Sequence, residues 1–337
     1  MIARTASVAP AKGLAAEDLR LALRAAMLYH VDGLTQVEVA ERLGLSRPTA
    51  GRLIARARAQ GLVKIEVALP DGLAVHADLE RRLETTFDLA EAIVVPDAGG
   101  NDEVNSVSLG RAAAGLLVRR LQPTHRLGLA WGHTMAAMAD ALPAGSTRCA
   151  EVVQLDGSTS SVGYRTRGEY IINHCADHFE AVPFPLSAPL YADVSTVTSL
   201  RKDSLISKTV TRGSKCDIVM FSVGDLSTAS TLLSGSLIGP EVLDELIERG
   251  AVGDACGRFF RLDGTAVGKP LSARTVSVEL DELRRCPVRV LVAGGMRKRE
   301  AILGALRGDL ARVLVTDDSV ATWLIGQNAS TVEEGSS

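Results

Sequence analysis

Basic side chains gather in one short stretch near the beginning of the chain, where their chemistry suits contact with a polyanion. Between residues 42 and 65 there are six basic residues and no acidic one. Residues 1–70 carry ten Lys and Arg against six Asp and Glu, a charge of +4, so the remainder of a chain with net charge −3 carries −7. A basic segment on an otherwise acidic protein is typical of a small nucleic-acid-binding module attached to a larger domain.

The basic stretch lies in a pattern that predicts a helix-turn-helix. Thr35 and Glu38 form a capping box that opens one helix, Gly44 ends it, and Ser46 caps the next helix. In that second helix the apolar positions fall on one face, so the polar positions must fall on the other. The predicted DNA-contacting residues are Thr35, Gln36, Ser46, Arg47, Thr49, Arg52 and Arg56.

These residue types match what a DNA groove offers. Arginine can place a bidentate fork on guanine, threonine can hydrogen-bond a base or touch a thymine methyl group, and the helix start can bind a phosphate. A strand over residues 62–67 would follow, with Lys64 either contacting the DNA backbone as part of a wing or lying on the surface. The simpler alternative is a three-helix scaffold whose arginines are only a solvated face.

Glycine-rich loops form a second group of candidate functional residues. They fall at residues 127–134, 154–159, 222–225, 250–260 and 292–298, and most follow an apolar, β-branched run. Ligands of open α/β sheets bind at the carboxyl ends of the strands. We therefore expect these loops to converge on one sheet edge and to form a small-molecule site. No G-x-G-x-x-G follows a strand and no G-x-x-x-x-G-K-[ST] occurs, so dinucleotide and P-loop sites are excluded.

The elements that must position these loops follow from the hydrophobic pattern. From about residue 91, short Val/Ile/Leu runs alternate with helical stretches, which predicts an α/β fold with an open, mainly parallel sheet and helices on both faces. A chain of 337 residues is long enough for about two domains. We predict a winged helix-turn-helix domain over residues 14–70, a linker helix over 71–90 and a ligand-binding and oligomerisation domain over 91–328.

Several motifs together resemble the SorC family of sugar-responsive bacterial transcriptional regulators. They are the helix-turn-helix, the W-G-x-T turn at 131–134, G-A-V-G-D-x-x-G-R-F-F at 250–260, A-G-G-x-x-K-x-x-A-I at 293–302 and L-x-T-D at 314–317. The resemblance covers about residues 18–326. It implies a winged DNA-binding domain and a Rossmann-like effector domain similar to sugar-phosphate isomerases. It also implies a homodimer or homotetramer and a sugar, polyol or sugar-phosphate effector.

The same resemblance implies a set of effector-binding residues. Carried over position by position, they are Gly132, Thr134, Gly157, Ser158, Gly224, Asp225, Asp254, Arg258 and Lys298. His133 is a departure, because the family often has Arg after that glycine, and we include His133 in the predicted site. A neutral histidine lowers the local positive charge, which leaves a phosphorylated effector in doubt and keeps a neutral sugar or polyol open.

Two other functions compete with this interpretation. An isomerase or deaminase could use Asp254 as a base and Lys298 to stabilise an oxyanion, although a helix-turn-helix on the same chain favours sensing. A metal sensor could use His174 and His178, which share a helix face, but zinc would need further ligands. We expect a regulator without catalytic activity, cofactor or metal.

Composition excludes several further classes. The five cysteines are an odd number without a C-x-x-C pair, so neither a disulfide framework nor a thiolate zinc site is indicated. Aromatic residues make up only 4%, too few for a broad stacking platform. The first residues have no apolar signal core, and no apolar run approaches the roughly 20 residues that span a bilayer. We expect a cytoplasmic protein.

Overall fold

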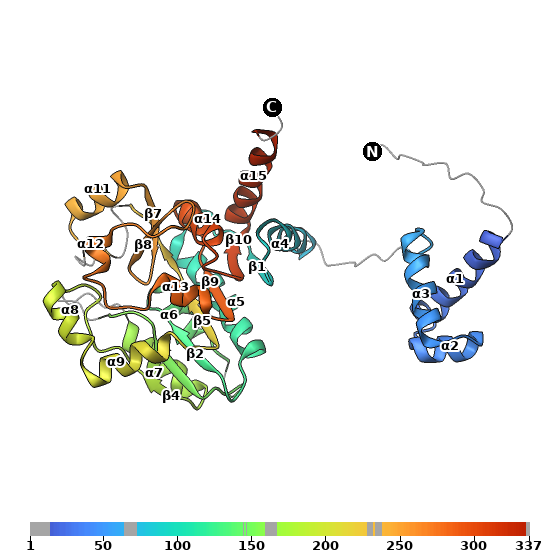
Figure 1. The fold of residues 1–337 in the computed structure, drawn as a ribbon, viewed down its shortest axis with the longest axis horizontal. Helices are drawn as coiled ribbons and strands as arrows, with labels where there is room; N and C mark the ends of the chain where they lie inside the picture. Colours follow the sequence, from blue (N-terminus) through green and yellow to red (C-terminus); the bar gives the residue numbers. More distant parts are fainter. Residues whose placement is uncertain are drawn as a thin grey trace. The chain divides into compact units, whose positions relative to one another are not determined.

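The chain divides into two units between Leu69 and Pro70. The computed structural model describes residues 14–63, 73–143, 145, 147–158, 167–227, 232 and 238–334. Figure 1 shows the elements of each unit. Each unit is described by itself.

The N-terminal unit consists, in its described part, of three helices: α1 (Leu14–His30), α2 (Gln36–Leu43) and α3 (Arg47–Ala59). The predicted caps are present. Thr35 and Glu38 form the capping box of α2, Gly44 ends that helix in the left-handed conformation, and the Ser46 side chain accepts a hydrogen bond from the backbone N–H of Thr49. Small and branched side chains fill the space between the helices: Ala22, Ala25, Ala26, Leu28, Val39, Ala40, Ala50, Leu53, Ile54 and Ala57. The helix-turn-helix prediction is confirmed. The expected strand beyond Val63, with Lys64, lies outside the described residues.

The second unit is built on a seven-stranded sheet in which every neighbouring pair is parallel. Its strands are β1 (Glu91–Val95), β2 (Arg126–Leu129), β3 (Glu151–Gln154), β4 (Val182–Phe184), β5 (Ile218–Phe221), β9 (Val288–Val292) and β10 (Val313–Asp317). The spatial order is β1-β10-β9-β5-β2-β3-β4. Without β1, this is the doubly wound order in which the chain reverses direction across the sheet, here between β2 and β5. The prediction of a mainly parallel, Rossmann-like sheet is confirmed.

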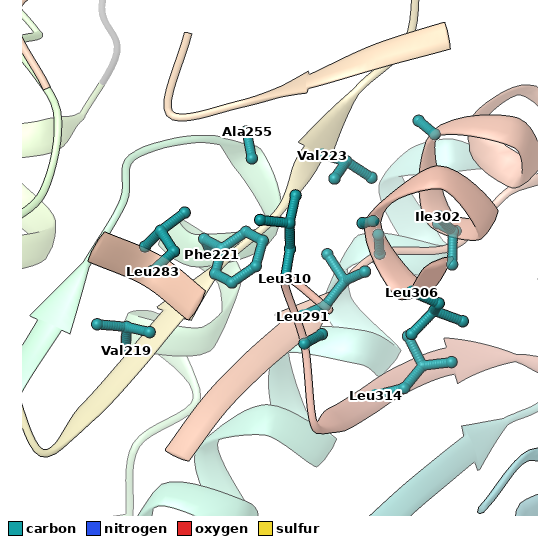
Figure 2. Close-up of a cluster of buried hydrophobic side chains, with 14 of the residues drawn as sticks. Val219, Phe221, Val223, Ala255, Leu283, Leu291, Ile302, Leu306, Leu310 and Leu314 are labelled. Carbon is teal, nitrogen blue, oxygen red and sulfur yellow. The ribbon is translucent and has the colours of Figure 1, made fainter. Parts of the chain in front are cut away.

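Helices cover both faces of this sheet. The described helices of this unit are α4 (Leu73–Phe87), α5 (Asp102–Arg120), α6 (His133–Asp140), α7 (Gly168–His178), α8 (Val194–Leu200), α9 (Ser204–Gly213), α11 (Pro240–Glu248), α12 (Lys269–Ser272), α13 (Leu280–Arg285), the 3₁₀ helix η1 (Met296–Lys298), α14 (Arg299–Arg307) and α15 (Asp318–Glu334). Of these, α8, α11 and α12 pack in smaller apolar clusters apart from the two faces of the sheet. Successive strand residues alternate between the two cores: Ile218 and Met220 pack with α5, α6 and α7, while Val219 and Phe221 pack with α4, α14 and α15. Both faces are buried, which explains the uninterrupted apolar runs in the sequence. Figure 2 shows part of the core on the face covered by α4, α14 and α15, with Phe221, Leu291 and Ile302.

A smaller antiparallel sheet of β6 (Val223–Gly224), β7 (Ala251–Ala255) and β8 (Arg258–Arg261) was not anticipated. Residues 250–260, interpreted from sequence as a glycine-rich loop, form the β7–β8 hairpin of this sheet. The glycines serve close packing and the turn. A Cβ at Gly253 would overlap Ala301 of α14, and Gly257 has φ +73° in the hairpin turn.

Helix α4 lies within residues 71–90, the segment predicted as a linker helix, and it packs against β1 and α15 of the second unit. Its Glu80 and Glu84 carboxylates accept hydrogen bonds from the backbone N–H groups of Val94 and Ala92 on β1, at 2.9 and 3.0 Å. The helix thereby covers the outer edge of β1 and belongs structurally to the second unit. Among the described helices, none combines the length and the hydropathy needed to cross a bilayer.

Candidate DNA-contact helix and ligand cavity

The solvent-facing side of α3 carries the predicted polar residues. Ala50, Leu53, Ile54 and Ala57 turn one side of the helix into the core, which leaves Arg47, Arg52 and Arg56 exposed. The Ser46 and Thr49 hydroxyl oxygens lie 2.8 Å apart, and the Arg52 guanidinium donates to the Thr49 hydroxyl at 3.4 Å. These contacts order a row of hydrogen-bonding groups along the first two turns of α3.

Three other predicted residues already have partners within this unit. Arg56 forms an ion pair with Asp18 of α1, with 3.2 Å between Nη1 and Oδ2. The Thr35 hydroxyl donates to the Glu38 carboxylate at 2.8 Å, and hydrogen bonds from Thr35, led by its backbone N–H, lower the pKa of Glu38. Gln36 lies against Gly51 of α3. Thr35 and Gln36 therefore help to fix how α2 meets α3, besides lying at the exposed start of α2.

A cavity of about 700 Å³ opens in the second unit at the carboxyl ends of β2, β3, β5 and β9. This is where the strand order reverses, the place at which doubly wound sheets bind ligands. Its walls come from the turns after those strands, the first two turns of α5 and the β6–β7–β8 sheet. The cavity is large enough for a sugar-sized molecule.

Seven of the predicted effector residues line this cavity. They are Gly132, His133, Thr134, Gly224, Asp225, Asp254 and Lys298. The pairing of β6 with β7 sets Gly224 opposite Asp254, and a Cβ at position 224 would overlap Oδ1 of that aspartate. The absence of a side chain at Gly224 thus leaves space for the Asp254 carboxyl group in the cavity wall.

The other three predicted residues lie outside the cavity. Arg258 is buried in β8 and donates to the backbone oxygens of Val278 and Ser277 at 2.7 and 3.2 Å, and it pairs with Glu279 at 2.8 Å. Its guanidinium ties the hairpin to residues 277–279, so we no longer include it among the effector ligands. The sequence pattern did not separate this role from ligand binding, because both use a charged side chain beside glycine.

Gly157 and Ser158 follow β3 just beyond the cavity wall. The backbone oxygen of Gly157 accepts a hydrogen bond from the Trp131 indole at 2.9 Å, and a Cβ there would overlap the backbone of Pro189. The Ser158 hydroxyl lies 3.0 Å from Nε2 of Gln154. Their neighbour Asp156 lines the cavity instead, and the signal that could have identified it was an acidic residue two positions after the end of a buried strand.

Burial shapes the electrostatics of the cavity. It raises the pKa of Asp254 to about 6, although Oδ2 accepts a hydrogen bond from the Gly257 N–H at 3.0 Å and Lys298 lies nearby. Burial also raises the pKa of Asp156 well above its usual value and lowers that of Lys298, an effect that Asp225 and Asp254 oppose. A protonatable carboxyl and a partly desolvated amine therefore share one cavity.

Asp317, at the end of β10, holds one wall of the cavity together. Its Oδ2 accepts hydrogen bonds from the Gly295 N–H at 2.6 Å and from the Asn105 amide at 2.9 Å, and its Oδ1 accepts from the Val320 N–H at 2.9 Å. The turn that carries Lys298 and the start of α5 are thereby joined. The L-x-T-D motif contained this residue, but its spacing gave no indication of the role.

The metal-binding alternative finds no support in the described part of the chain. No group of three or more His, Cys, Asp and Glu side chains is arranged there to hold a metal ion. His174 stacks on Tyr170, with 5.2 Å between ring centroids, and His178 makes an edge contact with Phe179. The five cysteines are buried and unpaired.

A helix-turn-helix joined to a doubly wound domain with a cavity at its switch point defines a ligand-responsive DNA-binding regulator. Comparison with known proteins agrees. Residues 73–326 match the family model described as "Putative sugar-binding domain", and residues 25–72 match the MarR family. The chain belongs to the SorC family of sugar-binding transcriptional regulators.

Individual relatives align over nearly their whole length. The deoxyribonucleoside regulator of Bacillus subtilis is 33% identical, covering 92% of this chain and 98% of the relative. The sorbitol operon regulator of Klebsiella pneumoniae is 29% identical, covering 92% and 98%. The crystal structure of full-length SorC from K. pneumoniae aligns with a TM-score of 0.68 and 26% identity, covering 92% and 99%.

Proposed function

We propose that this regulator controls genes of carbohydrate or polyol catabolism by binding an operator through α3 and a small effector in the cavity at the β2–β5 switch point. The observation that carries the proposal is the cavity itself, which is sugar-sized and has Asp225, Asp254 and Lys298 in its lining. The names of the relatives, which refer to sorbitol and deoxyribonucleosides, support this class of effector. Control of operators would place the protein in the cytoplasm, where bacterial DNA lies.

The predicted DNA contacts keep their assignment in this proposal. Arg47 and Arg52, with Thr49 between them, would read base edges from the major groove, while the start of α3 and the start of α2 would meet phosphates. Arg56 would exchange its Asp18 partner for the DNA backbone, because both side chains are exposed.

Regulation further requires that the effector prefer one arrangement of the protein over another. We propose a homodimer or homotetramer that presents two copies of α3 to half-sites about one helical turn apart or a multiple of it. A coupling free energy of about 1–3 kcal/mol between the effector site and the operator site would change operator affinity about 5–150-fold.

A two-stage experiment tests the proposal. Thermal unfolding of the full chain is first screened against sugars, polyols and their phosphates, since a ligand at 100 times its dissociation constant adds about 2.7 kcal/mol of stability. A stabilising compound is then added to a gel-shift assay with upstream DNA of the adjacent operon. We expect a change in operator affinity. Absence of any sequence preference over random competitor DNA, with or without the compound, would contradict the proposal.

An isomerase or deaminase activity is the second candidate. It is favoured by the raised pKa of Asp254 and the lowered pKa of Lys298 in one cavity, the combination that proton transfer between sugar carbons needs. The named relatives are regulators, and we propose that the cavity binds without turnover. Incubation with candidate sugar phosphates, followed by NMR, should yield no product; product formation that Asp254→Asn abolishes would establish catalysis.

A further inference from the structure

Acidic side chains outnumber basic ones around the cavity. Among the described lining residues there are six carboxyl groups and three strongly basic groups. The carboxyl groups belong to Asp102, Glu103, Asp140, Asp156, Asp225 and Asp254, and the basic groups to Arg167, Arg297 and Lys298. A site that binds a phosphate ester usually presents basic groups or backbone N–H donors to it.

Both arginines already have a carboxylate partner. Arg297 pairs with Asp102. Arg167 pairs with Asp140 at 3.3 Å, with its guanidinium 4.4 Å from the ring centre of Tyr170. Burial lowers the pKa of Lys298, and the nearby Asp225 and Asp254 oppose that effect. A phosphate dianion at either arginine would have to displace its carboxylate partner, and at Lys298 it would lie beside Asp225 and Asp254.

A backbone donor two residues before α6 is occupied as well, although no described side chain caps the first N–H groups of the helix itself. The Trp131 N–H donates to Oδ1 of Asp156 at 3.3 Å, directly before the Gly132 turn from which α6 begins. This carboxyl group therefore takes up a donor and stands beside the place where a phosphate would bind a helix start. No lysine or arginine is present among residues 131–134 of the sequence.

Two buried polar atoms in the wall point to a different ligand chemistry. Asn105 is only 4% exposed, and its Nδ2 donates to Asp317, which fixes the orientation of the amide. Its Oδ1 has no hydrogen-bond partner among the described residues, and neither has the buried Ser222 hydroxyl oxygen. Both residues line the cavity. A buried acceptor without a partner is costly, so a ligand that supplies hydroxyl donors would be favoured there.

We propose that the cavity selects an uncharged polyhydroxylated effector, a sugar or alditol, and discriminates against the corresponding phosphate monoester. This inference rests on the proposed function, since it assigns the chemistry of the same cavity. Hydroxyl groups donate to the carboxylates of Asp225 and Asp254 and to Oδ1 of Asn105. A fully ionised phosphate has only acceptors and adds negative charge beside those carboxylates.

Matched pairs of ligands test the inference. Isothermal titration calorimetry of the full chain at fixed salt compares four- to six-carbon sugars and alditols with their monophosphates, for example sorbitol with sorbitol 6-phosphate and ribose with ribose 5-phosphate. We expect the uncharged member of a binding pair to bind at least 10-fold more tightly. A phosphate that binds equally or more tightly overturns the inference and leaves the proposed function standing. If neither member of any pair binds, the proposed function fails and the inference falls with it.

A charge-neutralising variant tests the cause of the discrimination. Asp225→Asn keeps an oxygen that can accept the hydrogen bond from the Ser227 N–H, now at 2.8 Å, but removes one negative charge. This variant should bind the phosphate member of each ligand pair roughly 3–10-fold more tightly, relative to its affinity for the uncharged member. Glu103→Gln, at the exposed start of α5, provides a second variant should the first fail to fold. Asp263→Asn, outside the cavity, should change neither affinity. Discrimination unaltered in a folded Asp225→Asn or Glu103→Gln variant contradicts the electrostatic explanation.

Discussion

At the scale of single residues, the second unit uses charge in two different ways. Asp254 is almost fully buried in the cavity wall, and a single backbone N–H and a nearby amine compensate its charge incompletely. Arg258, four residues further along, is equally buried but is satisfied by backbone oxygens and Glu279. Buried groups of the first kind are typical of binding sites, and those of the second kind hold a fold together.

Asp254→Asn should change how stability depends on pH. The folded-state pKa of about 6 lies above the usual 3.8, so this carboxyl group stabilises the fold when protonated, and that stability is lost as pH rises through 6. An asparagine does not ionise. Relative to the parent, the variant should therefore gain up to about 3 kcal/mol in free energy of unfolding between pH 4 and pH 8. Urea denaturation at both pH values measures this difference.

Asp263→Asn is the matched control for that measurement. Hydrogen bonds from the Thr265 side chain and backbone lower the pKa of this exposed aspartate. Its stabilising contribution is present at neutral pH and is lost as pH falls, so the control should lose stability relative to the parent at high pH. If the Asp254→Asn and parent curves instead run parallel, Asp254 does not titrate near pH 6.

Lys298→Ala should leave operator binding intact and weaken the response to effector. Lys298 is the last residue of η1 and precedes α14 in the cavity wall, in the unit that does not contain the helix-turn-helix. The measurement is the midpoint of effector titration in a gel-shift assay at constant DNA. A midpoint equal to that of the parent would remove Lys298 from the binding site.

Arg52→Ala should cost about 1–3 kcal/mol of specific operator binding and relax the preference at one base pair. The reason is that Arg52 projects from the exposed side of α3, opposite the buried residues. Arg58→Ala is the matched control, because this arginine is also exposed on α3 but six residues away, on a different side. The control should weaken binding to all sequences alike. Equal losses on operator and random DNA for both variants would refute a base contact by Arg52.

At the scale of elements, the turns after β2, β5 and β9 build the cavity because parallel strands deliver all their carboxyl ends to one edge. The β6–β7–β8 sheet then closes part of that edge, with Asp254 directed into the wall. The turn after β9 depends on Gly294, where a Cβ would overlap Oδ2 of Asp317 and crowd Leu109.

Gly294→Ala should lower the free energy of unfolding by about 1–3 kcal/mol, since the added methyl group displaces the Asp317 side chain that joins β10 to the turn and to α5. Gly115→Ala is the control. This glycine is exposed in α5 with nothing within 4 Å of an added Cβ, so the change should stabilise the helix by up to about 1 kcal/mol. Chemical denaturation of both variants gives the comparison; a neutral Gly294→Ala variant would show that the turn is more adaptable than its contacts indicate.

At the scale of the whole molecule, DNA reading and ligand binding belong to separate units of one chain. The division places α4 with the ligand-binding unit, because its carboxylates bond to β1.

Two independent units should give separable unfolding events. In differential scanning calorimetry of the full chain, a sugar that binds should raise the unfolding temperature of the second unit and leave the unfolding temperature of the N-terminal unit unchanged. Operator DNA should do the reverse. Each shift in unfolding temperature should increase with the ratio of free ligand concentration to dissociation constant. Transitions that move together with either ligand would show that the units unfold as one cooperative body.

The amino-acid sequence by itself determined the elements whose signals are local. The caps of α2 and α3, the glycine at the end of α2 and the buried side of α3 depend on residues within a turn or two, so their spacing identified the helix-turn-helix. The uninterrupted apolar runs likewise predicted a parallel sheet, because burial on both faces leaves no alternation. The glycine-rich loops after β2, β5 and β9 indicated the edge at which the cavity lies.

Only the tertiary structure decided which charged residues face the cavity. Arg258 and Asp254 belong to the same motif, but side chains at alternate positions of a hairpin point to opposite sides of its sheet. Arg258 therefore binds to residues 277–279 and does not face the cavity. Asn105 and Asp317 lie 212 positions apart and meet only because α5 packs beside β10. Such contacts depend on which strands become neighbours, and no local pattern of residues encodes that order.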